Sequence, residues 1–164
     1  MSRLDSAIRR LTAQKIALAW AKNQVLGRPG PVLELGLGNG RTYDHLREIL
    51  GATREIFVFE REIRAHPDCV PDDDHLFLGD FTDTLPRALA CLGSTALIAH
   101  LDIGTGDKRR STNLANRIRA DVEALLGPGA VAVSDQKVGS WENRRAVLPD
   151  GIPEGRIHLY QFTG

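Results

Sequence analysis

Short runs of apolar residues alternate along the chain with longer segments in which apolar residues recur every three or four positions. The run at residues 56–59 is apolar throughout, as expected of a parallel strand that is covered on both faces. We expect strands at residues 32–35, 56–59, 75–78, 96–101, 130–133, 146–148 and 156–162, and helices at residues 3–26, 42–50, 82–92 and 113–126. This alternation predicts an α/β fold with a doubly wound, mostly parallel sheet and helices on both faces, in one domain over residues 1–164.

The first predicted helix precedes the alternating units. Ser2 can cap its N-terminus, Asp5 suits its first turn, and Gly27 and Pro29 end it. Its apolar positions widen beyond one face between residues 13 and 21, so the helix needs more than one surface to pack against. We therefore expect residues 1–28 to be an N-terminal helical extension that packs on the core, covers a ligand as a lid, or forms a dimer contact.

A glycine-rich loop follows the first predicted strand. In the segment PVLELGLGNG, residues 31–40, three glycines are spaced two apart and a helix begins directly after them. Gly36, Gly38 and Gly40 lack the Cβ atoms that would keep a ligand away from the backbone, and they tolerate positive φ in a tight turn. The start of the new helix adds unpaired N–H groups. The loop therefore predicts a site for a nucleotide-like ligand.

Acidic residues stand near the ends of five predicted strands: Glu34, Glu60, Asp80, Asp102 and Asp135. The carboxyl ends of parallel strands meet at one edge of the sheet, and ligands of open α/β sheets bind there, near the topological switch point. One such carboxylate alone would be ordinary, because strand ends are solvated and loops favour Asp. Five of them indicate a polar site along that edge.

Two kinds of ligand compete for the glycine loop. A dinucleotide-binding loop prefers G-x-G-x-x-G, whereas this loop is G-x-G-x-G and Arg41 stands where the third dinucleotide glycine should be. Glu34 would repel a diphosphate but would suit a ligand with a cationic centre. Residues 32–40 closely resemble the first motif of class I S-adenosyl-L-methionine-dependent methyltransferases, and the resemblance extends over roughly residues 30–135.

This resemblance implies a Rossmann-like fold with a seven-stranded sheet and roles for particular residues. Glu60 would bond both ribose hydroxyls, Asp80 would accept from the adenine amino group, and Phe81 would flank the adenine ring. The segment 100–102 would meet the methionine part and the substrate. The residues expected to bind S-adenosyl-L-methionine are Glu34, Gly36, Leu37, Gly38, Asn39, Gly40, Glu60, Arg61, Gly79, Asp80, Phe81 and Asp102.

Methyl transfer requires an acceptor in line with the methyl–sulfur bond and, for many acceptors, a base. Asp102 and His100 are candidates because alternate residues of a strand share a face, although His100 fits a structural role equally well. In the related catechol-type O-methyltransferases, Mg²⁺ is held at corresponding strand ends, near Asp102, Asp135 and Gln136. Three residues on unrelated loops are weak evidence, so we expect no metal.

Two polar segments could contact the acceptor. Residues 104–110 include a cationic cluster that could bind an anionic substrate, but the simpler interpretation is a solvated start of a helix capped by Ser111 or Thr112. Trp141, with Arg144 and Arg145, could line an acceptor pocket or anchor the surface.

Composition narrows the function class. The 164 residues have a formal net charge of zero, which argues against a nucleic-acid substrate and favours a small-molecule acceptor. No apolar run approaches the roughly 20 residues of a membrane span, and we expect that the charged residues near the N-terminus do not form a secretory signal. Cys69 and Cys91 have no partners at metal spacing and fit a reducing cytoplasm. The alternatives are a non-catalytic S-adenosyl-L-methionine-binding protein that acts through a homodimer surface, and an NAD-dependent oxidoreductase.

Overall fold

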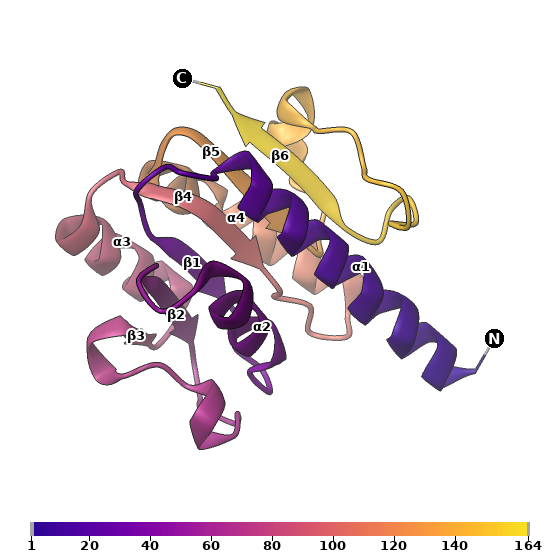
Figure 1. Ribbon diagram of the computed structural model, residues 1–164, viewed down its shortest axis with the longest axis horizontal. Helices are drawn as coiled ribbons and strands as arrows, with labels where there is room; N and C mark the ends of the chain where they lie inside the picture. The colour runs from indigo at the N-terminus through magenta and orange to yellow at the C-terminus, as the bar shows by residue number, and fades with distance from the viewer. Residues whose placement is uncertain (1, 164) are drawn as a thin grey trace.

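A single mixed sheet forms the centre of the computed structural model, which describes residues 2–163 (Figure 1). Met1 and Gly164, the ends of the predicted domain, lie outside the described residues. The strand order is β3-β2-β1-β4-β5-β6. The first five strands are parallel, and β6 runs antiparallel to β5. The strands are β1 (Val32–Leu35), β2 (Ile56–Glu60), β3 (Leu76–Leu78), β4 (Ala96–Leu101), β5 (Leu126–Ser134) and β6 (His158–Phe162).

The sheet has six strands where the sequence predicted seven. The segment expected as a strand at residues 146–148 makes only one bridge, between Arg145 and Tyr160, and one further backbone bond, from Ala146 N to Leu159 O at 2.8 Å. Val147 is 90% exposed and Pro149 follows, so the segment leaves the sheet edge as soon as it reaches it. The fold class is confirmed and the strand count is corrected.

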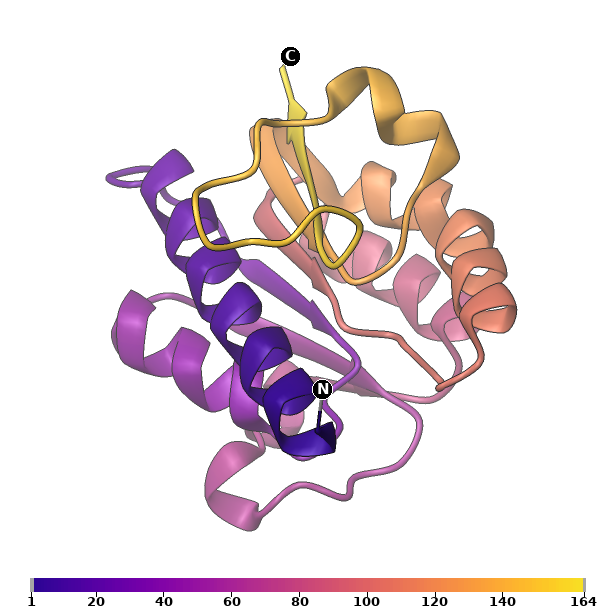
Figure 2. The same cartoon turned by 90° about the vertical axis from the view of Figure 1, so that its right-hand side faces the viewer.

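Four helices cover the two faces of the sheet: α1 (Arg3–Gln24), α2 (Arg41–Leu50), α3 (Phe81–Leu92) and α4 (Lys108–Leu125). α1 and α2 lie on one face, and α3 and α4 lie on the other (Figures 1 and 2). Three short 3₁₀ turns complete the chain: η1 (Pro67–Cys69), η2 (Asp73–His75) and η3 (Gly139–Arg144). Both faces are therefore covered, as the continuous apolar strands predicted.

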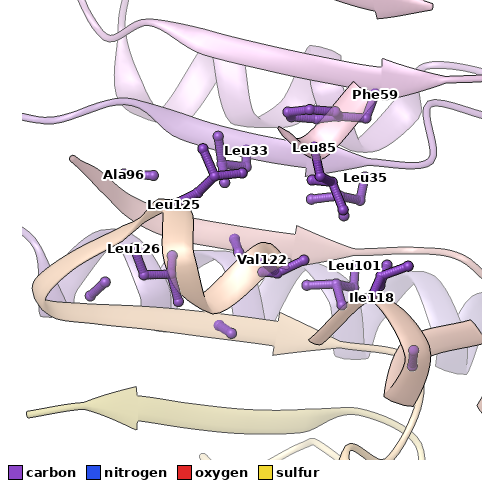
Figure 3. Close-up of a cluster of buried hydrophobic side chains, with 14 of the residues drawn as sticks. Leu33, Leu35, Phe59, Leu85, Ala96, Leu101, Ile118, Val122, Leu125 and Leu126 are labelled. Carbon is purple, nitrogen blue, oxygen red and sulfur yellow. The ribbon is translucent and has the colours of Figure 1, made fainter. Parts of the chain in front are cut away.

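Side chains of each strand alternate between two apolar cores. Leu33 and Leu35 of β1 belong to the core beneath α3 and α4, which also contains Leu85 of α3 and Ile118 of α4 (Figure 3). Val32 points to the opposite core, beneath α1 and α2. By the same alternation Glu34 faces α1 and α2, and His100 of β4 stands beside it because the two residues are register partners. A polar pair is thus built into an otherwise apolar layer.

Two local predictions are corrected. α4 begins at Lys108 rather than near residue 113, and its N-cap is Asp107, which accepts from the Arg110 amide at 3.0 Å, rather than Ser111 or Thr112. Trp141 does not lie at the surface. It is fully buried, packs edge-on against Tyr160 and Phe162, and is part of the core.

Candidate functional site

The glycine loop between β1 and α2 is shaped by close backbone approach. Gly36 has φ +89°, and a Cβ there would lie 2.2 Å from the carbonyl oxygen of Asp102, which follows β4. Gly38 has φ +54° and open space around it. Gly40, at φ +83°, begins α2 against Cys69. Gly36 therefore seats the loop against the neighbouring strand, and Gly38 leaves its backbone accessible.

Glu60, at the end of β2, holds the same loop by its carboxylate. Its Oε2 accepts from the amides of Leu37 and Gly38, at 2.9 and 3.0 Å. Its Oε1 accepts from the Arg61 amide at 2.7 Å. Charge-assisted bonds of this kind are roughly twice as strong as neutral ones, so the strand end and the glycine loop form one connected unit.

A cavity of about 590 Å³ opens at the carboxyl ends of the strands, beside the switch point between β1 and β4. Its volume is within the usual range for a small-molecule or cofactor site. Seven of the predicted cofactor residues line it: Gly36, Gly38, Glu60, Arg61, Asp80, Phe81 and Asp102. We refer to this space as the donor cavity.

The other predicted cofactor residues lie beside or behind the donor cavity. Leu37 and Asn39 line a smaller adjoining pocket between the glycine loop and α1. Gly40 packs against Cys69, and Gly79 donates its amide to the Glu60 carbonyl at 2.9 Å, so both act through the backbone.

Arg61, one of the predicted cofactor residues, pairs with another of them, Asp80. Its guanidinium reaches the Asp80 carboxylate, with Nε at 2.9 Å and an Nη at 2.5 Å. Both side chains are exposed, so the pair is screened by water and can exchange partners readily. Asp80 therefore already accepts hydrogen bonds from the guanidinium group of Arg61.

The structure does not bring Glu34 or His100 to the donor cavity. Glu34 is fully buried, and its carboxylate accepts from the Thr42 hydroxyl on α2 and bonds to Nδ1 of His100 at 2.6 Å. His100 is 2% exposed. The two residues form a buried pair that joins β1, β4 and α2, which favours the structural role that the sequence also allowed for His100. Ligand contact by Glu34 and a role of His100 as a base stay predictions that gain no support from this placement.

The charge state of this pair follows from its surroundings. Burial by itself would lower the pKa of His100, but the adjacent Glu34 carboxylate outweighs burial and raises that pKa to about 9. The raised pKa favours the protonated form of His100 at neutral pH.

Stability should consequently depend on pH. The unfolded value is about 6.5, so protonated His100 stabilises the fold fully below pH 6.5, and this contribution is lost as pH rises through about 9. We expect the free energy of unfolding to fall by up to about 3 kcal/mol across this range. Urea unfolding at a series of pH values measures it. A Glu34→Gln variant should lack most of the slope, and equal slopes in both proteins would contradict the assignment.

Asp102 lies at the cavity wall nearest α1. Its Oδ2 accepts from the Gln14 amide at 2.9 Å, so α1 is tied to the site. Asp135, after β5, accepts from the Ile103 amide at 3.3 Å, and burial together with the nearby Asp102 charge raises its pKa. The structure thus brings the two carboxylates that follow β4 and β5 to one cavity.

The magnesium hypothesis gains no support from the grouping of side chains. Across residues 2–163, no group of three or more His, Cys, Asp or Glu side chains is arranged to hold a metal ion. Gln136, its third candidate, instead accepts from the Thr112 hydroxyl at 3.2 Å.

One wall of the donor cavity comes from α4 and the loop before it: Ile103, Gly104, Thr105, Arg110, Asn113, Leu114 and Arg117. Sequence reasoning named residues 104–110 as a possible substrate-binding segment but missed Ile103 and the α4 residues Asn113, Leu114 and Arg117. The spacing of residues 110, 113, 114 and 117 on one helical face was a usable signal, but the helix was expected to begin too late for it to be recognised.

Together, the strand order, the glycine loop and the carboxylates at the ends of β2 and β3 define a Rossmann-like α/β protein with a polar cavity at its switch point. A sequence model of a family described as S-adenosyl-L-methionine methyltransferase matches residues 1–162. The chain belongs to this family. It is an S-adenosyl-L-methionine-dependent methyltransferase, and the nicotinamide and non-catalytic alternatives are not favoured.

Solved structures agree. An S-adenosyl-L-methionine methyltransferase from Silicibacter pomeroyi is 41% identical, with 98% of each chain covered and a TM-score of 0.90. The O-methyltransferase TomG of Streptomyces achromogenes is 17% identical over 74% of this chain and 54% of that one, with a TM-score of 0.57. A methyltransferase from Geobacter sulfurreducens is 12% identical over 93% and 80%, also with a TM-score of 0.57. The last two show the fold alone.

A search of curated proteins finds no match to the sequence. Among the helices of the described residues, none combines the length and the apolar character that crossing a membrane requires.

Proposed function

We propose that the donor cavity binds S-adenosyl-L-methionine and that the protein transfers its methyl group to a small-molecule acceptor. The observation that carries this proposal is the convergence of the Gly36–Gly38 backbone, Glu60 and Asp80 on one cavity. Carboxylates accept from hydroxyl and amino groups, and a ribose and an adenine present these groups. The two carboxylates stand at the ends of the neighbouring strands β2 and β3 and line the same cavity, where one nucleoside could reach both.

The fit requires some exchange of partners. A carboxylate has about four lone-pair sites, and Glu60 already accepts three backbone bonds. One of these bonds would be replaced when two ribose hydroxyls are bound. Arg61 would likewise turn away from Asp80 or stack on the base, and its exposure makes this movement inexpensive.

S-adenosyl-L-methionine supplies an electrophilic methyl group, so the protein contributes mainly placement. Gly36 and Gly38 admit the ligand to the backbone, and Glu60 and Asp80 fix its orientation. Asp102 and Asp135 stand on the acceptor side, where a carboxylate can take the proton that a hydroxyl or amine loses.

Replacing Glu60 tests the donor site. Glu60→Ala should weaken S-adenosyl-L-methionine binding by about 1–3 kcal/mol, because it removes charged hydrogen bonds to the ribose. Isothermal titration measures the change. Glu62→Ala is the matched control, since Glu62 is exposed, pairs with Arg64 and lies outside the lining of the donor cavity. An unchanged affinity in Glu60→Ala would refute this role for Glu60.

The same titration distinguishes the donor. S-adenosyl-L-methionine and S-adenosylhomocysteine should bind, and NAD should not. Binding of NAD without a response to the other two would contradict the proposed chemistry.

Three sequence predictions stay predictions: a single domain over residues 1–164, a cytoplasmic location and a homodimer formed through the N-terminal helix. The dimer prediction has a surface to test, because Leu4 and Ile8 near the start of α1 are 69% and 53% exposed. Sedimentation of a Leu4→Lys variant beside the unchanged protein examines it.

A further inference from the structure

A second hollow adjoins the donor cavity on the far side of Asp102 and Gly104. One lobe, of about 270 Å³, is lined by Arg10, Gln14, Asp102, Asp135 and Arg156, among others. A second lobe, of about 460 Å³, shares Asp135 and Arg156 with the first and extends to Lys108. We call the two lobes together the acceptor cavity. It adjoins the donor cavity at Asp102 and Gly104, which line both spaces.

Gly104 joins the two spaces. It lines the donor cavity and both lobes of the acceptor cavity. A Cβ at this position would lie 2.6 Å from Oδ2 of Asp135, although the backbone φ lies outside the left-handed region. Residue 104 must therefore be glycine because a Cβ atom would clash with Asp135, and not because of its backbone φ angle. A side chain at residue 104 would narrow the opening between the two cavities.

Three cations surround the acceptor cavity from three separate parts of the chain. Arg10 comes from α1, Lys108 begins α4, and Arg156 precedes β6. Among residues 2–163, no carboxylate lies within ion-pair distance of any of the three. In contrast, the nearby Arg144 and Arg145 pair with Glu123 and Glu142.

The acceptor cavity thus carries both kinds of charge. Its first lobe holds the carboxylates of Asp102 and Asp135, which accept hydrogen bonds, together with Arg10 and Arg156. Its second lobe adds the ammonium group of Lys108 and the exposed carboxylate of Glu154. The planar fork of Arg matches a carboxylate or phosphate, whereas Asp102 and Asp135 would repel such an anion. A ligand that satisfies both kinds of group has a hydrogen-donating group at the two aspartates and an anionic group at the cations.

We propose that the methyl acceptor is a small molecule with a hydroxyl or amino nucleophile at one end and a carboxylate or phosphate at the other. The proposal rests on the function proposed above. The nucleophile faces Asp102 and Asp135 through the Gly104 opening, and the anion binds Arg156 and Lys108, with Arg10 at the side of α1. The nucleophile forms a bond to the methyl carbon, the carbon–sulfur bond breaks with its electron pair left on sulfur, and the acceptor proton passes to a facing carboxylate.

Matched ligand pairs test the inference. The protein, loaded with S-adenosylhomocysteine, is titrated with 4-hydroxybenzoate and 4-hydroxybenzamide, with β-alanine and its amide, and with phosphoethanolamine and ethanolamine. We expect the anionic member of at least one pair to bind, and its neutral counterpart to bind about 10- to 100-fold more weakly, as expected for the loss of charged hydrogen bonds. Comparison of the two carboxylate pairs with the phosphate pair shows which type of anion the cavity prefers. In separate reactions with S-adenosyl-L-methionine, the formation of S-adenosylhomocysteine measures turnover.

Charge variants assign the binding to this cavity. Arg156→Gln and Lys108→Gln should each weaken the anionic ligand by about tenfold or more while leaving S-adenosyl-L-methionine affinity unchanged, because neither side chain lines the donor cavity. Arg119→Gln, an exposed arginine on α4 that lines neither cavity, removes the same charge and should change neither affinity.

Three results would overturn the inference: equal binding of neutral and anionic members, no binding of any anionic member at millimolar concentration, or equal losses in Arg119→Gln and Arg156→Gln. None of these concerns donor binding. If S-adenosyl-L-methionine itself fails to bind the unchanged protein, the proposed function has failed, and the two failures are therefore distinguishable.

Discussion

Replacing Glu34 with alanine should lower the free energy of unfolding by about 3–5 kcal/mol, because it leaves a buried charge without a partner. His100 is 2% exposed, and its Nδ1 lies 2.6 Å from the Glu34 carboxylate. Without Glu34, the imidazole must either hold a charge in an apolar layer or lose its proton, and Thr42 loses its acceptor. Urea unfolding at pH 7 measures the change.

Two further variants separate the charge from the packing. Glu34→Gln retains a hydrogen-bond acceptor of similar shape and should cost less than Glu34→Ala. Replacing Glu34 and His100 together with leucine should recover much of the loss, because an apolar pair leaves no buried polar group unsatisfied. Glu62→Ala, at an exposed position, should leave the free energy unchanged. A Glu34→Ala cost no larger than that of Glu62→Ala would contradict the assignment.

This buried pair changes the meaning of the acidic residue before the glycine loop. The sequence suggested that Glu34 offers its charge to a cationic ligand. In the structure, the carboxylate instead links β1 to β4 through His100 and to α2 through Thr42. The glycine loop connects β1 with α2, so these bonds fix both ends of the loop. Glu34 therefore acts on the donor site by positioning it.

The sequence predicted most of the strands because burial on both faces leaves a continuous apolar run. β1 and β4 were placed at their observed bounds, Val32–Leu35 and Ala96–Leu101. The strand at the edge of the sheet was harder to predict. The segment at 146–148 has the apolar character of a strand, but pairing with β6 ends after the bridge at Arg145. Whether an edge segment pairs depends on the path of the neighbouring chain, which local pattern does not encode.

In the donor site, the residues at the ends of strands could be predicted from the sequence. The residues that contact them from distant parts of the chain could not. Glu60 and Asp80 were recognised from their position after β2 and β3. Gln14, which bonds Asp102, is 88 residues distant in the chain. In the sequence, Gln14 has the pattern of an ordinary polar residue of a helix. Its contact with Asp102 exists only because α1 packs across the sheet. The acceptor cavity depends on the same placement, because α1 supplies Arg10.

Gly36→Ala should have the other large effect. At φ +89° the new side chain is strained, and its Cβ would lie 2.2 Å from the carbonyl oxygen of Asp102. The obstacle is backbone, which cannot turn aside as a flexible side chain can. Left-handed strain of about 1–2 kcal/mol and overpacking of about 1–3 kcal/mol together give an expected loss of about 2–5 kcal/mol in the free energy of unfolding.

Gly38→Ala is the matched control two residues later in the same loop. Its φ of +54° brings comparable left-handed strain, but nothing lies within 4 Å of the added Cβ. We expect a loss of only about 1–2 kcal/mol in the free energy of unfolding. Because Gly38 lines the donor cavity, its methyl group should instead weaken S-adenosyl-L-methionine binding. Urea unfolding and isothermal titration of both variants therefore separate two uses of glycine in one loop: Gly36 is required by the fold, and Gly38 by the ligand. Equal unfolding losses in the two variants would show that contact with Asp102 does not set the loop's position.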